Sequence, residues 1–190
     1  MAEAIQRLLD KSEIHDVVQR YARSVDRRDW ASARAAFFED ATDHHGDFFG
    51  TRDEFIEWVS ANHAKVPKST HMLGNCLIEF GSDEVATVET YFFAVLELNA
   101  SSEGHRKMFF GDAEDNGQQG NIRMDVLGRY VDRFEKRNNE WRIAKRVTVF
   151  DSTHARPNIG TVDDHPNWAL GKRDGSDPIF SVRRAAGLEG

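Results

Sequence analysis

The chain of 190 residues is 39% hydrophobic and 30% charged, which is enough sequence to bury the core of a single domain. Its formal net charge of −7 and pI near 5.6 argue against nucleic acid and membrane surfaces as partners, because both attract basic proteins. Its one cysteine, Cys76, excludes a disulfide within the chain, and no apolar run suggests a signal peptide or a membrane span. We therefore expect a cytoplasmic protein.

Residues 2–26 are predicted to form a helix. From Ile14 to Val25 the apolar residues recur every three or four positions, as they do on a helix with one buried side. Asp26 follows Ala22 by four positions and so points roughly the same way. A charge directed at a core is a conflict that often marks a functional site. The alternative, an aspartate at the helix end that faces water, stays open at this point.

Two shorter helices are predicted to follow. Asp29 can cap a helix from Trp30 to Phe38, because its side chain can accept a hydrogen bond from a free backbone N–H of the first turn. Thr51 and Glu54 have the spacing of a capping box at the start of another helix. Both helices carry apolar residues at helical spacing, so each is expected to pack one side against the core.

Between these helices, residues 42–45 are predicted to form a short strand. Neighbouring side chains of a strand face opposite sides, so only one of His44 and His45 can face an interior pocket. Together with Asp43 and Asp47 these histidines suggest a metal site, but their spacing matches no standard zinc pattern. We therefore predict no metal.

From Thr70 onward the pattern has a period of two, which is typical of strands. Residues 99–121 interrupt this pattern with glycines and acidic residues, and we expect a long, mobile hairpin loop that folds over a pocket mouth. Two adjacent asparagines favour a tight turn before the last strand. The predicted strands are Thr70–Phe80, Val85–Leu98, Ile122–Lys136 and Glu140–Phe150.

Three helices followed by long strands predict an α+β fold, in which three N-terminal helices pack on a strongly curved antiparallel sheet. Such a sheet forms a cone with an apolar interior pocket. Residues 1–150 would make up this domain. Residues 151–190, in which prolines and glycines break the strand pattern, would form a C-terminal arm that packs on the body or on a partner subunit.

The main candidate for a functional site is a pair formed by Asp26 and His71, which lies at the start of the first long strand. Histidine exchanges protons near neutral pH, and a carboxylate on its other ring nitrogen fixes its tautomer and stabilises the imidazolium. We expect His71 to be the base, or base and then acid, with Asp26 orienting it and Tyr21 donating to a hydroxyl or phenolic oxygen. Aromatic side chains would line the pocket around a flat apolar substrate, although core packing explains each of them alone. These are Trp30, Trp58, Tyr91 and Tyr130.

The order of these residues resembles that of the SnoaL-like branch of the nuclear transport factor 2-like superfamily. The resemblance covers about residues 5–150, and it rests on the joint order of several short motifs. In chain order these are Tyr21-x4-Asp26-x2-Asp29-Trp30, Phe38-x-Asp40-Ala41, Thr51-x-x-Glu54-Phe55, Ser69-Thr70-His71-x-x-Gly74-Asn75, Gly128-Arg129-Tyr130-x-Asp132-x-Phe134 and Trp141-Arg-Ile143.

Within that superfamily the sequence looks most like the cofactor-free lyases scytalone dehydratase, bile-acid 7α-dehydratase and lindane dehydrochlorinase. The resemblance places Asp26 and His71 on their catalytic Asp and His, and Tyr21 on a position that is Tyr in the bile-acid enzyme. It places His45 where both dehydratases have a tyrosine that contacts substrate. It places Arg146 where the dehydrochlorinase has an arginine that assists the leaving anion. The resemblance thus implies a substrate-binding role for His45 and Arg146, and no cofactor.

The resemblance and the Asp26–His71 pair together predict a cofactor-independent lyase that acts on a small-molecule substrate, a hydrophobic aromatic or polycyclic hydroxy compound. Dehydration is expected, and one form of it is a route through a quinone methide, coupled to loss of formaldehyde from a lignin-derived diarylpropane diol. Two alternatives stay open. One is an isomerase or polyketide cyclase that uses the same pair, and the other is a non-catalytic small subunit of a ring-hydroxylating dioxygenase. The resemblance also implies a homodimer or homotrimer.

Overall fold

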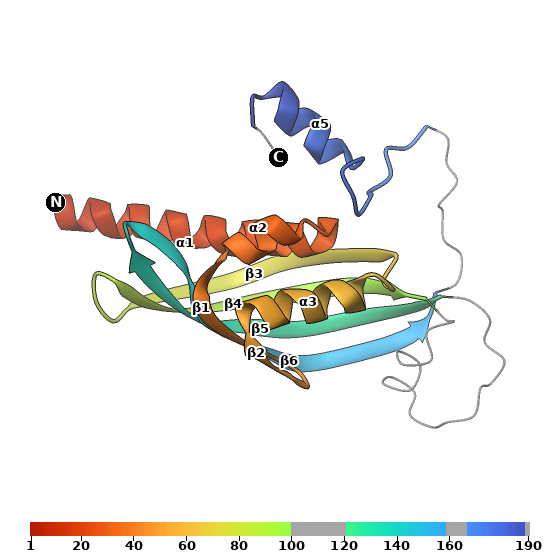
Figure 1. Ribbon diagram of the computed structural model, residues 1–190, viewed down its shortest axis with the longest axis horizontal. Helices are drawn as coiled ribbons and strands as arrows, with labels where there is room; N and C mark the ends of the chain where they lie inside the picture. The colour runs from red at the N-terminus through yellow and green to blue at the C-terminus, as the bar shows by residue number, and fades with distance from the viewer. Residues whose placement is uncertain (100–120, 159–166, 189–190) are drawn as a thin grey trace.

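The computed structural model describes residues 1–99, 121–158 and 167–188, and in these it places three N-terminal helices over one side of a curved sheet (Figure 1). No helix within these ranges is long and apolar enough to cross a bilayer. The helices are α1 (Ala2–Arg27), α2 (Trp30–Ala35), α3 (Arg52–His63) and α5 (Pro178–Ala185). The strands are β1 (Phe37–His45), β2 (Phe48–Thr51), β3 (Lys68–Phe80), β4 (Val85–Leu98), β5 (Ile122–Arg137) and β6 (Glu140–Pro157).

The sheet has six strands in the order β2-β1-β6-β5-β4-β3 and is open, with β2 and β3 at its edges. The strands β3 to β6 form a continuous antiparallel meander, and β1 and β2 form a hairpin. The β1–β6 pair is parallel, an arrangement that needs a long connection, and β1 and β6 are far apart in the chain. The α+β class and the helix-covered, curved sheet are thus confirmed.

The first helix runs without interruption from Ala2 to Arg27 and buries one side against the sheet. Asp26 lies on this buried side and is 6% exposed, so the aspartate faces the core and not open water. The helix ends at Arg27, and the next residue, Arg28, has a left-handed backbone that turns the chain away; its N–H donates to the carbonyls of Ser24 and Val25. The sequence pattern therefore predicted both the helix and the direction of Asp26.

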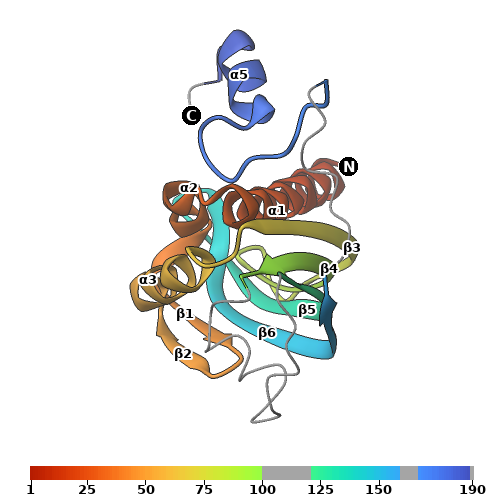
Figure 2. The same cartoon turned by 90° about the vertical axis from the view of Figure 1, so that its right-hand side faces the viewer.

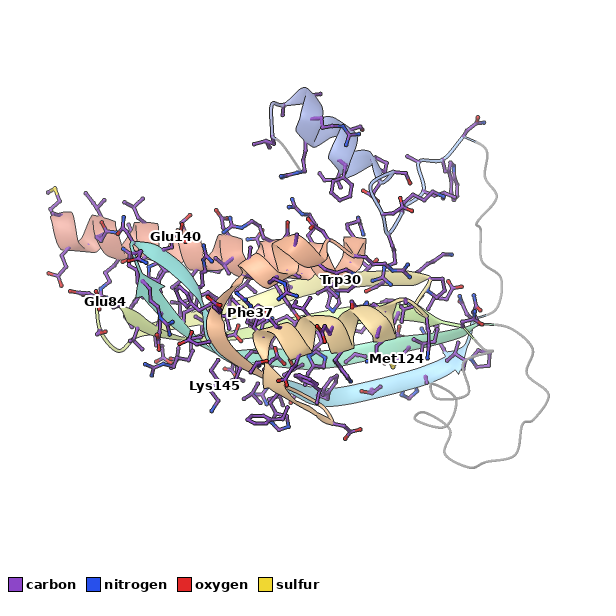
Figure 3. All side chains as sticks on the ribbon, in the orientation of Figure 1. Trp30, Phe37, Glu84, Met124, Glu140 and Lys145 are labelled. Atoms are coloured by element: carbon purple, nitrogen blue, oxygen red, sulfur yellow. The ribbon has the colours of Figure 1, made fainter. Side chains whose placement is uncertain are left out.

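The second helix is shorter than predicted. Asp29 caps it as expected, accepting a hydrogen bond from the backbone N–H of Ser32 at 3.1 Å, but the helix ends at Ala35. The next residues join the sheet instead, because the Ile143 N–H donates to the Ala36 carbonyl and Phe37 pairs with Ile143. Pairing with β6 thus overrides the local helical pattern. Phe37 is fully buried in the layer of side chains between the helices and the sheet (Figure 3).

The predicted start of the third helix and the predicted hairpin turn are present, and the last strand is longer than predicted. The capping box of Thr51 and Glu54 is present, and both Asn138 and Asn139 have the positive φ of a tight hairpin turn. The strand predicted to end at Phe150 continues to Pro157. The predicted loop over residues 99–121 lies almost wholly outside the described residues. α5, near the C-terminus, lies beyond α1 on the side away from the sheet (Figure 2).

Candidate active site

Asp26 and His71 form a buried hydrogen-bonded pair between the end of α1 and the start of β3. His71 Nδ1 lies 2.7 Å from Asp26 Oδ1, and the His71 backbone N–H donates to Oδ2, also at 2.7 Å. The hydroxyl of Ser69 donates to Oδ1 at 2.8 Å. Both carboxylate oxygens are therefore held by one strand, which fixes the carboxylate relative to the imidazole.

Strand alternation explains why Ser69 and His71 act together. They are two positions apart on β3, so their side chains project from the same face, toward the last turn of α1. Asp26 approaches that face from the buried side of α1. The last turn of α1 and the first residues of β3 thus bring the three side chains together.

The environment of Asp26 keeps it ionised. Burial raises the pKa of its carboxyl group, but hydrogen bonds and charge from His71, with the hydrogen bond from Ser69, outweigh burial and leave the pKa below its ordinary value. An ionised carboxylate can only accept hydrogen bonds, so His71 carries its proton on Nδ1. Nε2 then has a free lone pair, and no described residue hydrogen-bonds it. This is the arrangement of a general base.

A cavity of about 550 Å³ lies between α1 and β3, and Asp26 and His71 are among its lining residues. His15, Arg23 and Cys76 line it as well. The aromatic residues predicted to line a substrate pocket are absent from the described wall of this cavity, namely Trp30, Trp58, Tyr91 and Tyr130.

Tyr21 belongs to a second cluster, around the guanidinium of Arg146. This guanidinium lies over both rings, 4.2 Å from the ring centre of Tyr21 and 4.1 Å from that of Tyr130, and the two rings contact each other edge to face. Two hydrogen bonds of 2.7 Å join it to the carboxylate of Asp132, and both side chains of this ion pair are fully buried. Burial raises the pKa values of both tyrosines, which keeps their hydroxyls protonated.

His45 lies in a third cluster, among aromatic rings. Its imidazole is 5.6 Å from the ring of Phe55, 5.6 Å from that of Trp58 and 5.5 Å from that of Phe150, between centroids. Burial lowers the pKa of His45 to about 3, so it is neutral. Asp43, on the same face of β1, is fully buried, and its Oδ1 lies 3.9 Å from His45 Nδ1.

The first two clusters are connected through Phe92. Its ring lies 6.0 Å from the imidazole of His71 and stacks on Tyr130 at 4.5 Å, between centroids. Gly128 makes room for this ring, since a Cβ there would lie 2.6 Å from a carbon of Phe92. Ring contacts on the inner face of the sheet therefore connect the imidazole of His71, through Phe92, with Tyr130 beside Arg146.

Two of the predicted substrate contacts lie elsewhere. Tyr91 is 40% exposed on the outer face of β4, because its neighbours Thr90 and Phe92 take the inward positions of the alternating strand. The prediction that Tyr91 faces an interior substrate is therefore wrong. Trp30 packs edge-on against His63, with 6.0 Å between ring centroids, and joins none of the three clusters.

A family model for the SnoaL-like domain matches residues 6–147. The chain belongs to this SnoaL-like family. The resemblance to the nuclear transport factor 2-like superfamily is thereby confirmed, and the open cone of strands under N-terminal helices is the fold expected for it. None of the curated proteins matches the sequence.

Solved structures share the fold of this SnoaL-like chain. Hexachlorocyclohexane dehydrochlorinase LinA-type3 from Novosphingobium barchaimii LL02 is 17% identical, with a TM-score of 0.65 over 83% of this chain and 96% of that one. A protein from Novosphingobium aromaticivorans DSM 12444, provisionally named a scytalone dehydratase, is 18% identical, with a TM-score of 0.63 over 84% and 99%. Rv3472 of Mycobacterium tuberculosis, of unknown function, is 21% identical, with a TM-score of 0.58 over 97% and 92%. At these identities the likeness establishes the fold alone.

Several polar residues of the SnoaL-like domain were not predicted as part of the site. Ser69, Asp132 and Asp43 each lie two positions from a predicted site residue on a strand, so alternation alone could have placed them on the inner face. Arg173 had no such signal. It donates to the carbonyls of Val25, at 2.8 Å, and Asp26, at 2.9 Å, and so ties the C-terminal segment to the last turn of α1.

Across the described ranges, no group of three or more His, Cys, Asp and Glu side chains is placed to hold a metal ion. His44 and His45 point to opposite faces of β1, and His44 is exposed.

Replacing Asp43 by Asn should change how the stability of the domain depends on pH. Burial raises the pKa of Asp43 to about 7, with Arg146 opposing this shift and Asp132 adding to it. Its ordinary value is about 4, so the folded state binds the extra proton between these values. The free energy of unfolding then falls as pH rises, by up to about 1.4 kcal/mol per pH unit.

His45 has the opposite effect on stability. Its pKa is lowered in the folded state, so as pH falls below about 6.5 the unfolded chain binds a proton that the folded protein does not, and the free energy of unfolding falls. Asp43→Asn removes only the first effect. The stability gained by the variant over the wild type should therefore grow as pH rises toward neutral, in urea unfolding measured across this range. Parallel pH profiles for the two proteins would show that Asp43 is ionised throughout.

Proposed function

We propose that this protein is a cofactor-independent lyase that eliminates water from a hydrophobic aromatic or polycyclic hydroxy compound. The observation that carries the proposal is the geometry of His71. Its Nδ1 is bound by the ionised Asp26, and its Nε2 is left free of hydrogen bonds from the described residues. A base of this kind needs no metal or redox group to remove a proton from carbon.

In the proposed reaction, Nε2 of His71 takes a proton from the carbon next to the one that bears the hydroxyl group. The electron pair of that C–H bond forms the double bond as the C–O bond breaks. Asp26 stabilises the imidazolium that forms. The imidazolium then returns its proton to the departing hydroxide, which leaves as water, and His71 is neutral again.

A carbonyl or phenol on the substrate would lower the barrier by accepting negative charge. The hydroxyls of Tyr21 and Tyr130 are protonated, and the guanidinium of Arg146 lies over both rings, so this cluster offers donors to such an oxygen. A phenol could also release a leaving group through a quinone methide. That route would allow coupled loss of formaldehyde from a lignin-derived diol.

The names of two structural neighbours support an elimination. One is a dehydrochlorinase, which removes hydrogen chloride, and the other is provisionally a dehydratase, which removes water. Both names describe removal of a proton and a leaving group from adjacent carbons. The Asp26–His71 pair can supply the proton transfer in either case.

The experiment is a substrate panel with mass detection. Aryl-propanediols, hydroxy-sterols and polyketide phenols are incubated with the wild type and with folded His71→Asn protein as the control. Loss of one water from a substrate, in the wild type only, supports the lyase. Loss of water together with formaldehyde identifies the carbon–carbon cleaving variant. Release of water at the same rate by both proteins would contradict the proposal.

An isomerase or polyketide cyclase is the second candidate, because the same pair can move a proton between two carbons of one substrate. The panel separates the two, since an isomerisation leaves the mass unchanged. The predicted homodimer or homotrimer and the cytoplasmic location remain predictions. Sedimentation velocity of the purified protein would test the first.

A further inference from the structure

We propose that Arg173 is a positioning residue for the acid–base pair, and that the C-terminal segment, residues 167–188, thereby becomes part of the active site. The guanidinium of Arg173 fixes the backbone that carries Asp26 against the backbone that leads to His71. This inference rests on the proposed function only in taking that pair to be the catalytic one.

One guanidinium joins the two elements that supply the pair. At the end of α1 it donates to two carbonyls, from Nη2 to Val25 at 2.8 Å and from Nε to Asp26 at 2.9 Å. Its third nitrogen, Nη1, donates to the carbonyl of Val66, just before β3 begins. Arg173 therefore spans the junction between the last turn of the helix and the strand that carries His71.

The chemistry of these acceptors favours an arginine. The last four carbonyls of a helix have no partner within it, and a cation near them also interacts favourably with the helix dipole. A guanidinium presents five N–H donors in one rigid plane, so a single side chain can reach three carbonyls at once. A lysine at the same position could keep the charge but not this set of hydrogen bonds.

The groups around Arg173 are consistent with a charged guanidinium that only donates. Burial and the charges of Arg28 and Arg27 lower its pKa to about 10, with Asp26 opposing them, so it stays charged at neutral pH. Its Nη2 lies 2.8 Å from Nδ1 of His63, at the end of α3. Burial, with the charge of Arg173 adding to it, lowers the pKa of His63, so this imidazole is neutral and can accept the hydrogen bond.

The C-terminal segment is itself anchored beside Arg173, where the chain before α5 comes close to the end of α1 (Figures 1 and 2). Asp177 is 5% exposed, accepts a hydrogen bond from the backbone N–H of Lys172 at 2.8 Å, and caps α5 through the N–H of Ile179 at 3.1 Å. Its carboxylate also pairs with Arg27 at 3.2 Å. The backbone around Arg173 is thus already fixed to α1, which lowers the entropy cost of placing the guanidinium.

The hydrogen bonds of the pair depend on this junction. His71 reaches Asp26 with both its ring and its backbone N–H, each at 2.7 Å, so any shift of α1 relative to β3 changes both contacts. A displacement of about 1 Å in a catalytic group can cost about 10²-fold in rate. Arg173 is not among the described residues that line the cavity, so its effect on the reaction passes through the pair.

The test reads the tautomer of His71 by nitrogen NMR of the full chain, which needs no substrate. The resonances of His71 are assigned by their loss in His71→Asn. In the wild type we expect one tautomer, with the proton on Nδ1 and exchanging slowly with water. Arg173→Met should give a mixture of tautomers and several-fold faster exchange, and Arg173→Lys, which keeps the charge, should lie between the two.

Arg7→Met is the matched control. Arg7 lies near the other end of α1, where its guanidinium donates to the carbonyl of Ser82 at 3.0 Å and to the carboxylate of Asp83 at 2.6 Å. It therefore also ties α1 to the sheet, but far along the helix from Asp26. This variant should lose the stability of such a contact and keep the wild-type resonances of His71.

For any compound that the substrate panel shows to be turned over, Arg173→Met should lower kcat by up to about 10²-fold and leave KM nearly unchanged. Wild-type resonances of His71 in folded Arg173→Met, or the same change in Arg7→Met, would overturn the proposal and leave Arg173 a structural contact. If Arg173→Met does not fold, the comparison is made with Arg173→Lys, and wild-type resonances there would overturn it equally. A panel without any loss of water would contradict the lyase and leave the NMR result standing.

Discussion

A folded His71→Asn protein should turn over its substrate about 10²–10⁴-fold more slowly than the wild type, which is the usual contribution of a positioned general base. Asparagine keeps a polar side chain of similar reach but cannot take up a proton. The backbone N–H of residue 71 would still donate to Asp26, so the end of α1 should stay in place. The measurement is kcat/KM for whichever panel compound loses water, with circular dichroism as the check on folding.

Asp26→Asn should give a loss of similar kind, because an amide cannot stabilise the imidazolium. It should also remove part of the pH dependence of stability. The pKa of Asp26 is lowered in the folded state, so its carboxylate stabilises the fold above about pH 4, and this stabilisation is lost as pH falls further. The wild type should therefore lose more stability than the variant on acidification. Wild-type turnover in either folded variant would remove His71 and Asp26 from the mechanism.

The contact between Asp26 and His71 shows which parts of a site can be predicted from a sequence and which cannot. Helical spacing directed Asp26 at the core, and the strand pattern placed His71 at the start of a long strand. Their separation of 45 residues along the chain gives no distance, which depends on how α1 crosses β3. The resemblance to the SnoaL-like family supplied that step. The prediction for Tyr91 was wrong for a simpler reason. Aromatic residues occur on both faces of β4, and composition does not say which face is inward.

Strand alternation could place Asp132 and Asp43 on the inner face, but it could not show that they are buried. Charged residues on strands usually face water, so an aspartate two positions from Tyr130 or His45 is not expected to be fully buried. Only the packed sheet shows that each is set beside Arg146. Arg173 lies in a segment without periodicity, and its contact with the carbonyls of α1 depends on the path of the chain after β6.

Replacing Asp132 by Asn should lower the free energy of unfolding by about 3–5 kcal/mol, the usual cost of removing one partner of a buried ion pair. The guanidinium of Arg146 would be left over the rings of Tyr21 and Tyr130 without its counter-charge. Replacing both partners, as Asp132→Leu with Arg146→Met, should recover most of the loss, since no buried charge remains. Urea unfolding of the single and double variants measures both effects.

Asp43 makes this loss depend on pH. Asp43 is the register neighbour of Arg146 on β1, and the negative charge of Asp132 helps to keep its carboxyl group protonated. Without Asp132, Asp43 can ionise at lower pH and become the counter-ion of Arg146. The cost of Asp132→Asn should therefore shrink as pH rises, and adding Asp43→Asn should restore the full cost. Additive effects of the two substitutions at neutral pH would mean that Asp43 does not act as the reserve partner of Arg146.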